Sequence, residues 1–207
     1  MDEPRDLGLF PLGLVLLPGE RVPLHVFEPR YRQLVADCTL EDRLFVLVLA
    51  DEEDVARVGC AARFEELVRR FEDGRLNVIV AGVDPVEILE ETSGHLYLSA
   101  LVRSCEDLPE PADAALADEV RELFRTASEK ITGSSREPVT ADGVPLSYAV
   151  AGSLELDADV KQALLEERSE AERLARVRGI LSVALDGMDR ATVAALRAQS
   201  NGKVAHG

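Results

Sequence analysis

Short apolar segments separated by proline and glycine make up the first part of the chain. Residues 7–27 contain three such segments with the length of strands, and Pro18 with Gly19 supplies a turn between the second and the third. Because proline has no N–H to donate to a β-ladder, we expect these strands to lie at sheet edges or at bulges. A helix is predicted to begin at Pro29, since apolar residues then recur at helical spacing: Tyr31, Leu34, Val35 and Cys38.

The next apolar segments also have the length of strands. Residues 44–50 form a continuous apolar run, which is typical of a strand buried on both faces. Residues 58–70 and 75–83 flank Asp73 and Gly74, and an Asp-Gly pair between two such runs favours a β-hairpin. Alternation then predicts a half-buried strand with these inward residues: Leu96, Leu98, Ala100 and Val102.

Helical spacing replaces the strand patterns beyond a proline-rich linker at residues 108–111. Apolar residues recur at helical spacing over residues 116–131, and Gly133 is expected to end that helix. Further helices are predicted after an Asp157 cap and after a capping box that begins at Ser169. The last helix is expected to bury one stripe of apolar residues: Leu174, Val177, Ile180, Leu181 and Leu185.

These patterns divide the chain into two parts. Residues 1–107 are predicted to form a β-rich subdomain with one early helix, and residues 112–190 an α-helical bundle. Residues 198–207 are predicted to form a disordered tail. The predicted fold class is therefore α+β.

The composition disfavours several classes of partner. The formal net charge is −16 over 207 residues and both parts are acidic, so nucleic-acid backbones and anionic membranes would repel the chain. Its three cysteines are sparse and lack metal-ligand spacing, which fits a reducing compartment. The N-terminus lacks the basic region of a signal peptide, and the first apolar run is too short to span a bilayer. We expect a cytoplasmic protein that binds neither nucleic acid nor membrane.

A search for catalytic groups finds no constellation of the required residues. Lys130, Lys161 and Lys203 are the lysines of the chain, and none stands in the glycine-rich setting of a phosphate-binding loop. Lys130 and Lys161 are predicted to lie on exposed helix faces, which disfavours a Ser–Lys dyad. His25 is expected to be a structural residue of its strand, and the acidic run at residues 51–54 lacks the glycine of a calcium loop. We predict no catalytic residue, no metal site and no cofactor.

Several short motifs occur in an order that resembles a known family. They include Phe10-Pro11-Leu12, Pro18-Gly19-Glu20, Phe27-Glu28-Pro29-Arg30-Tyr31, Val58-Gly59-Cys60 and Lys161-Gln162-Ala163-Leu164-Leu165-Glu166. Together they are similar to the amino-terminal, substrate-binding domain of the Lon protease family, over residues 7–186. One departure is that Gly82 is followed by Val83-Asp84-Pro85, where the family often has Gly-x-x-Arg-Phe.

The resemblance implies both a fold and a role. The implied fold is a PUA-like β pseudo-barrel with one early helix, followed by an α-helical bundle. The implied role is that of a non-catalytic bacterial module that engages unfolded polypeptides or a client protein. Without the ATPase and peptidase of the family, such a module would serve as an adaptor for a protease. RNA binding, as in other PUA-like proteins, is the alternative, and a hydrolase with a hidden site is a third hypothesis.

Recognition of this kind would use exposed apolar patches rather than a catalytic group. One candidate surface is the outward face of the helix at residues 29–37, with these possible peptide contacts: Arg30, Tyr31, Arg32 and Gln33. The other is the groove between the β-rich part and the helices. Structural roles in turns, caps and the core are expected for Pro18, Gly19, Phe27, Glu28 and Tyr31, with Phe27 and Tyr31 filling the core.

Overall fold

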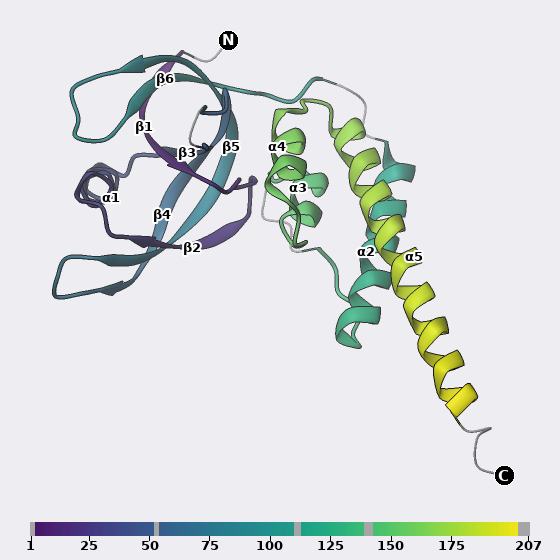
Figure 1. Cartoon of the computed structure of the whole chain (residues 1–207). Helices are drawn as coiled ribbons and strands as arrows, with labels where there is room; N and C mark the ends of the chain where they lie inside the picture. The colour runs from purple at the N-terminus through teal and green to yellow at the C-terminus, as the bar shows by residue number, and fades with distance from the viewer. Residues whose placement is uncertain (1–2, 52–53, 110–112, 139–142, 203–207) are drawn as a thin grey trace.

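The chain forms a β-barrel from its first half and a set of helices from its second (Figure 1). The computed structural model describes residues 3–51, 54–109, 113–138 and 143–202, with side chains up to Ala191. The arrangement confirms the α+β class, with a β pseudo-barrel, one early helix and a helical bundle. Residues 52–53 of the acidic run and 110–111 of the predicted linker lie outside the described residues.

In the described part of the chain, six strands make up one sheet that closes on itself. They are β1 (Arg5–Leu12), β2 (Arg21–Val26), β3 (Phe45–Leu49), β4 (Val58–Arg70), β5 (Leu76–Thr92) and β6 (Ser99–Ser104). Their order is β2-β5-β4-β3-β1-β6, and a further pairing of β5 with β6 closes the barrel. The predicted hairpin at Asp73 and Gly74 joins β4 to β5. Register shifts between these two long strands supply curvature that closure requires.

The prolines of β1 and β2 lie where one side of the strand has no neighbour among the described strands. Among the described strands, β2 pairs with β5 alone, which confirms the prediction of an edge strand. Gly82 N donates to Glu20 O at 2.9 Å, so the alternation of an antiparallel ladder turns the backbone nitrogen of Pro23 away from β5. β1 pairs with β6 in its first half and with β3 in its second, so Pro11 also has a described strand on one side only.

Helix α1 (Pro29–Glu41) packs against the outside of the barrel. Its buried side chains are the four that the spacing predicts: Tyr31, Leu34, Val35 and Cys38. The helix can approach closely because β1 has a glycine at Gly8. A Cβ atom there would lie 2.4 Å from Leu34 Cδ1 and 2.8 Å from Tyr97 Cε2.

The strand predicted to begin at Leu96 begins later. Leu96 and Leu98 precede β6 and are 78% and 41% exposed, so the prediction that both face the core is wrong. Gly94 adopts a φ of 129°, a conformation that favours glycine, and it turns the chain before β6. Tyr97 takes the inward position instead and is buried.

Among the described residues, four helices follow the barrel: α2 (Ala114–Thr132), α3 (Leu146–Ala151), α4 (Ala158–Glu166) and α5 (Glu170–Gly202). α2 ends, as predicted, at Gly133, whose φ of 74° is left-handed. Ser169 Oγ accepts a hydrogen bond from Glu172 N at 3.2 Å, which confirms the predicted cap of α5. α5 is helical to Gly202, and residues 203–207 of the expected tail lie outside the described residues.

Two details of the helices differ from the sequence prediction. Asp157 stands at the N-cap position of α4, but its side chain makes no capping hydrogen bond. Ile131 is 65% exposed, although the apolar stripe of α2 predicts it to face inward. It lies in the last turn of α2, beyond the buried residues Val120, Phe124 and Ala127.

The barrel and the helices share one apolar core. Phe45 of β3, Leu164 of α4 and Val177 of α5 belong to the same cluster of buried side chains. A second, smaller cluster is built from strand residues, among them Leu9 and Val46. The two halves are therefore packed together through side chains, and their division at residues 107–112 into subdomains stays a prediction.

A buried arginine joins the segment after β6 to the helices. Arg173 of α5 is fully buried and donates two hydrogen bonds to Asp107, at 2.7 and 2.5 Å, and two to Glu170, at 2.8 and 3.2 Å. Its guanidinium carbon lies 4.3 Å from the centre of the Tyr148 ring. Burial opposes the charge of Arg173, but the hydrogen bonds to Asp107 and the nearby carboxylate of Glu170 outweigh it and raise the pKa of the guanidinium.

A second ion pair fixes α4 to the turn before β2. Lys161 Nζ lies 2.5 Å from Glu20 Oε1, and the two side chains are only 13% and 10% exposed. The prediction that Lys161 lies on an exposed helix face is therefore wrong. Lys130 of α2 pairs with Asp189 of α5 and is about one third exposed.

Candidate functional site

Strand β2 leaves an aromatic side chain exposed at its end. Leu24 and Val26 are buried, and side chains alternate along a strand, so His25 and Phe27 point outward. Phe27 is 60% exposed, and the prediction that it fills the core is wrong. His25 is exposed as well, with its Nδ1 2.6 Å from Asn77 Oδ1. The alternation of β2 is the sequence signal that places both rings outside, and the apolar character of phenylalanine alone misleads here.

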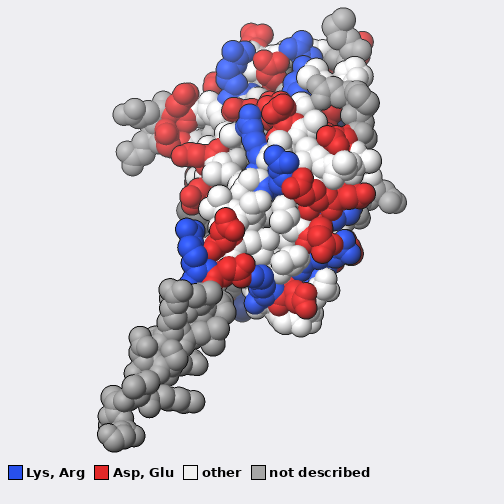
Figure 2. Space-filling model, turned by 90° about the vertical axis from the view of Figure 1, so that its right-hand side faces the viewer, with Lys and Arg blue, Asp and Glu red and all other residues white. Residues whose placement is uncertain are grey.

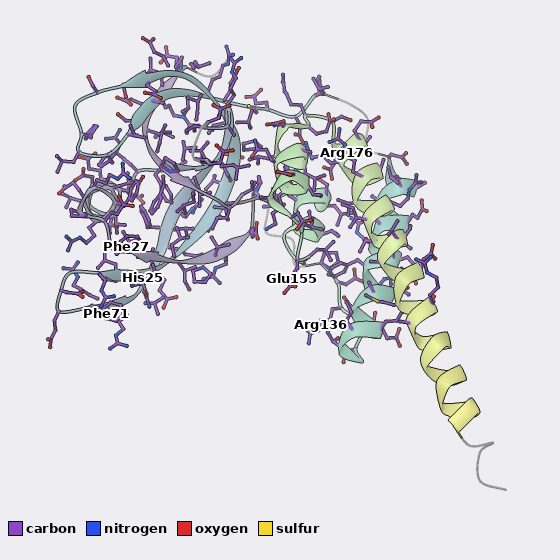
Figure 3. The ribbon with its side chains drawn as sticks, in the orientation of Figure 1. His25, Phe27, Phe71, Arg136, Glu155 and Arg176 are labelled. Atoms are coloured by element: carbon purple, nitrogen blue, oxygen red, sulfur yellow. The ribbon has the colours of Figure 1, made fainter. Side chains whose placement is uncertain are left out.

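Three rings meet where the β4–β5 hairpin passes β2 (Figure 3). We call His25, Phe27 and Phe71 the aromatic cluster. The His25 ring centre lies 6.2 Å from that of Phe27 and 5.9 Å from that of Phe71. The guanidinium carbons of Arg69 and Arg75 lie 4.5 and 5.2 Å from the Phe71 ring centre. The hairpin therefore adds positive charge and π-surface to the end of β2.

Phe27 also borders a pocket of about 490 Å³, which we call the Phe27 pocket. Its walls come from β1, from the segment that joins β2 to α1, and from the loops after β3 and before β6. The lining residues are Phe10, Pro11, Leu12, Gly13, His25, Val26, Phe27, Glu28, Arg30, Tyr31, Ala50, Asp51, Val55 and Leu98. A pocket with an apolar wall and a few polar groups can hold an apolar side chain while it bonds to neighbouring polar atoms of the ligand.

Two of the four predicted contact residues line the Phe27 pocket. Arg30 is exposed, and its Nε donates to Glu28 Oε2 at 2.8 Å. Tyr31 is buried and stacked on Phe10, with ring centres 4.2 Å apart, and burial raises the pKa of its hydroxyl. The Arg30 guanidinium carbon lies 4.6 Å from the centre of the Tyr31 ring. Tyr31 is therefore part of the wall of the Phe27 pocket, whereas Arg30 is accessible to a ligand.

The other two predicted contacts do not line the pocket. Arg32 is half-buried, and its Nη1 donates to Asp73 O at 3.3 Å in the hairpin turn. Gln33 is exposed, and its Nε2 donates to Asp37 Oδ1 at 2.6 Å. Because Phe71 stands two residues before Asp73, the hydrogen bond from Arg32 holds the hairpin turn next to the aromatic cluster.

The second predicted surface, between the β-rich part and the helices, contains a smaller groove of about 360 Å³. Its lining residues are Pro18, Val83, Asp84, Pro85, Ser104, Cys105, Glu106, Asp107, Gly143, Pro145 and Tyr148. Asp107 and Tyr148 both contact the buried Arg173. This groove therefore lies next to the ion network of Arg173, and Asp107 and Tyr148 in its walls help to hold the helices in place.

Two cysteines, Cys38 and Cys60, are buried in the barrel half, away from the residues that line the Phe27 pocket. Burial raises the pKa of the Cys38 thiol to about 11 and also raises that of Cys60, so both thiols are protonated near neutral pH. In the described part of the chain, no three His, Cys, Asp or Glu side chains come close enough to hold a metal ion together. The arrangement at Phe27 is suited to binding.

Charges of both signs cover the helical side of the molecule. Figure 2 shows acidic and basic side chains around a central uncharged area on this side. None of the helices, as far as the structure describes them, has both the length and the apolar character needed to cross a membrane.

A closed β-barrel with an early helix and a trailing helical bundle is an architecture with known relatives. The model of the ATP-dependent protease La (LON) substrate-binding domain family matches residues 6–183. The chain therefore belongs to the Lon substrate-binding domain family.

Solved structures and a longer relative agree with this membership. The Lon N-terminal domain protein from Xanthomonas campestris is 27% identical, with a TM-score of 0.61 over 84% of this chain and 96% of that chain. The N-terminal domain of Mycobacterium avium complex Lon protease has a TM-score of 0.66 over 86% of this chain and 98% of that chain; at 19% identity it supports the fold alone. Lon protease 2 of Herpetosiphon aurantiacus is 26% identical over 202 residues, 89% of this chain but 24% of that protein.

Proposed function

We propose that this protein recognises polypeptides at the Phe27 pocket and the adjoining aromatic cluster, and that it does not cleave them. The observation that carries the proposal is the exposure of Phe27, at 60%, beside a pocket of about 490 Å³. A phenylalanine so exposed forgoes hydrophobic stabilisation in the free protein, on the order of 1 kcal/mol. Contact with an apolar side chain of a ligand recovers it.

The rim of the Phe27 pocket suits the polar backbone of an extended chain. Arg30 and Glu28 form an ion pair whose side chains are 44% and 39% exposed. Because such an exposed pair contributes little to stability, its donors and acceptors can turn to a ligand at small cost. Apolar side chains from many different sequences can then occupy the pocket, which is what recognition of unfolded polypeptides requires.

Family membership supports the same role and suggests a wider one. The matched family is a substrate-binding domain, and this chain aligns with 24% of the relative named Lon protease 2. We propose that the protein is a cytoplasmic adaptor, which holds an unfolded polypeptide or a client protein and presents it to a protease.

Binding of a labelled, permanently unfolded model polypeptide to the 207-residue chain tests the proposal. We expect Phe27→Ala to weaken the binding at least about tenfold, because a few central apolar contacts carry most of the energy of an interface. Leu40→Ala is the matched control, since Leu40 is 86% exposed on α1 but does not line the pocket. Fluorescence anisotropy gives both affinities, and gel electrophoresis shows whether the polypeptide stays intact.

Equal affinities of Phe27→Ala and the unchanged protein would contradict the proposed site. If Leu40→Ala lowered the affinity for the polypeptide by the same factor, binding would reflect nonspecific contact with exposed apolar side chains. Cleavage of the polypeptide by the purified chain would contradict the non-catalytic role.

RNA binding is the second candidate function, and the aromatic cluster is the observation that favours it. Exposed rings with stacked arginines are a common platform for single-stranded nucleic acid, and Arg69 lies over Phe71 at 4.5 Å. The net charge of −16 opposes this function. If the affinity for a tRNA declines steeply with salt and is lost in Phe71→Ala, RNA rather than polypeptide would be favoured as the ligand.

A further inference from the structure

Helices α4 and α5 leave an apolar groove between them, on the helical half of the molecule. The groove has a volume of about 740 Å³, and its surface is almost entirely carbon. We define the α4–α5 groove by its uncharged surface residues: Val160, Ala163, Gly179, Ile180, Val183 and Ala184. Val183 is 70% exposed and Val160 is 36% exposed, so the groove is open to solvent.

Over residues 170–191, where the structure describes its side chains, helix α5 carries two apolar stripes, and the fold buries one of them. The buried stripe packs in the shared core: Leu174, Val177, Leu181 and Leu185. The second stripe recurs at the same helical spacing along the groove, through Gly179, Ile180, Val183 and Ala184. An aliphatic stripe that the fold does not cover is typical of a surface on which another helix packs.

The two helices run in opposite directions and form a trough. Arg176, near the start of α5, donates to Ala163 O at 3.0 Å and pairs with Glu167 at 3.0 Å, beside the C-terminal end of α4. Figure 3 shows Arg176 at this end of the trough and Glu155 at the other, before the start of α4. Glycine and alanine in the walls leave room for the backbone of an incoming helix.

Charge is unevenly distributed along the trough. Three exposed carboxylates, those of Glu155, Asp157 and Asp159, surround the N-terminal end of α4, and Asp159 lines the groove. At the opposite end, the positive charge of Arg176 is engaged by Glu167. The groove thus combines an aliphatic surface with negative charge at one end.

We propose that the α4–α5 groove binds an amphipathic helix of a partner protein. The helix inserts an aliphatic stripe between Val160 and Val183 and carries basic residues at the end that lies against Asp159. The acidic end sets the orientation of the helix and disfavours acidic competitors. This surface lies on other elements than the Phe27 pocket, and the proposal does not depend on the function proposed there.

Synthetic peptides and the 207-residue chain test the proposal. The probe is a labelled amphipathic helix with a leucine stripe and lysines at one end, and its counterpart has glutamates in place of the lysines. We expect the lysine peptide to bind at least about tenfold more tightly than the glutamate peptide. Val183→Asp is expected to weaken binding of the lysine peptide at least about tenfold, because it places a carboxylate in the apolar wall. This loss is expected even though the substitution adds negative charge.

Ile131→Asp is the matched control for Val183→Asp. Ile131 is 65% exposed on α2 and does not line the groove, so the same substitution there is expected to change the affinity less than about twofold. Glu155→Lys combined with Asp159→Lys is expected to reverse the preference, so that the glutamate peptide binds more tightly. Circular dichroism verifies the fold of each variant, and Val183→Ser serves if Val183→Asp loses helix.

Several results would overturn the proposal. If Val183→Asp binds the lysine peptide as tightly as the unchanged chain does, the lysines attach by charge alone. Equal affinities for the two peptides would remove the role of Asp159. Self-association of the chain that disappears in Val183→Asp would assign the groove to a second copy. Phe27→Ala is expected to leave peptide binding unchanged, so failure at the Phe27 pocket and failure at the groove are distinguishable.

Discussion

The barrel and the helical half expose apolar side chains in different chemical settings. On the barrel, Phe27 stands beside other rings and an exposed ion pair, in a pocket with several polar atoms. On the helices, Val160 and Val183 line a trough of carbon with carboxylates at one end. A mixed surface tolerates ligands of varied sequence, whereas a long aliphatic trough selects one shape. The difference points to two kinds of ligand on one small molecule.

The two halves also differ in the contacts that hold them in place. The helical half depends on the buried ion network around Arg173, which ties α5 to the segment after β6. The barrel depends on close backbone approach, because a Cβ atom at Gly82 would lie 2.2 Å from Leu17 O. Since both halves contribute to one core, we expect them to unfold together.

Arg173→Met is expected to have the largest effect on stability. It leaves the carboxylates of Asp107 and Glu170 without their buried partner, and we expect a loss of about 3–5 kcal/mol in the free energy of unfolding. Urea denaturation measures the loss. Arg176→Met is the matched control three residues along α5, because that side chain is 46% exposed and its pair with Glu167 contributes about 1 kcal/mol at most.

The shape of the transition in Arg173→Met sharpens the comparison between the halves. A single transition at lower urea, seen alike by helix and aromatic signals, agrees with one cooperative unit. Two separate transitions, with the barrel signal unchanged, would mean that the halves fold independently despite the shared core.

Gly82→Ala is expected to be the strongest simple change in the barrel. The new methyl group would meet Leu17 O, a backbone atom that cannot swing aside, and we expect a loss of about 2–3 kcal/mol. Gly13→Ala is the control, because a Cβ atom at Gly13 meets no other atom within 4 Å. Thermal unfolding compares the two, and equal melting temperatures would show that the turn before β2 yields easily.

Alkaline pH is expected to lower the stability of the folded protein mainly through the barrel half. We expect this effect to be smaller than those of Arg173→Met and Gly82→Ala. Burial raises the pKa of Cys38 to about 11, whereas an unfolded thiol ionises near about pH 8.5. The folded state therefore holds this proton more tightly. Its stabilisation is complete below about pH 8.5 and is lost progressively as the pH rises toward 11.

Urea denaturation between about pH 7 and pH 11 measures this decline. Cys38→Ala is expected to show a shallower decline than the unchanged protein, since the buried thiol of Cys60 remains. An identical pH dependence in both proteins would show that ionisation of Cys38 does not contribute.

Local signals in the sequence predict most of the fold. The spacing from Tyr31 to Cys38 identifies the buried face of α1, and Asp73 with Gly74 marks the hairpin. Gly133 and Ser169 mark helix ends because the left-handed conformation and the capping hydrogen bond each depend on one residue type.

The candidate sites depend on contacts between distant residues, and these are not readable in the sequence. Phe71 meets His25 only because β5 pairs with both β2 and β4. Arg173 donates hydrogen bonds to Asp107, which lies on the far side of the linker in the sequence, and no helix or strand spacing predicts this contact. Ile180 follows the helical spacing of a buried residue, yet it lies on the open stripe of α5, since packing decides which stripe is covered.

The position of Pro23 has a consequence for the behaviour of the protein at high concentration. An uncovered edge strand is a template on which a strand of another molecule can add, and such additions start aggregates. The outward nitrogen of Pro23 carries no hydrogen, so a new ladder along β2 would be interrupted at its middle. The barrel can therefore keep β2 open next to Phe27 while it resists strand-by-strand polymerisation.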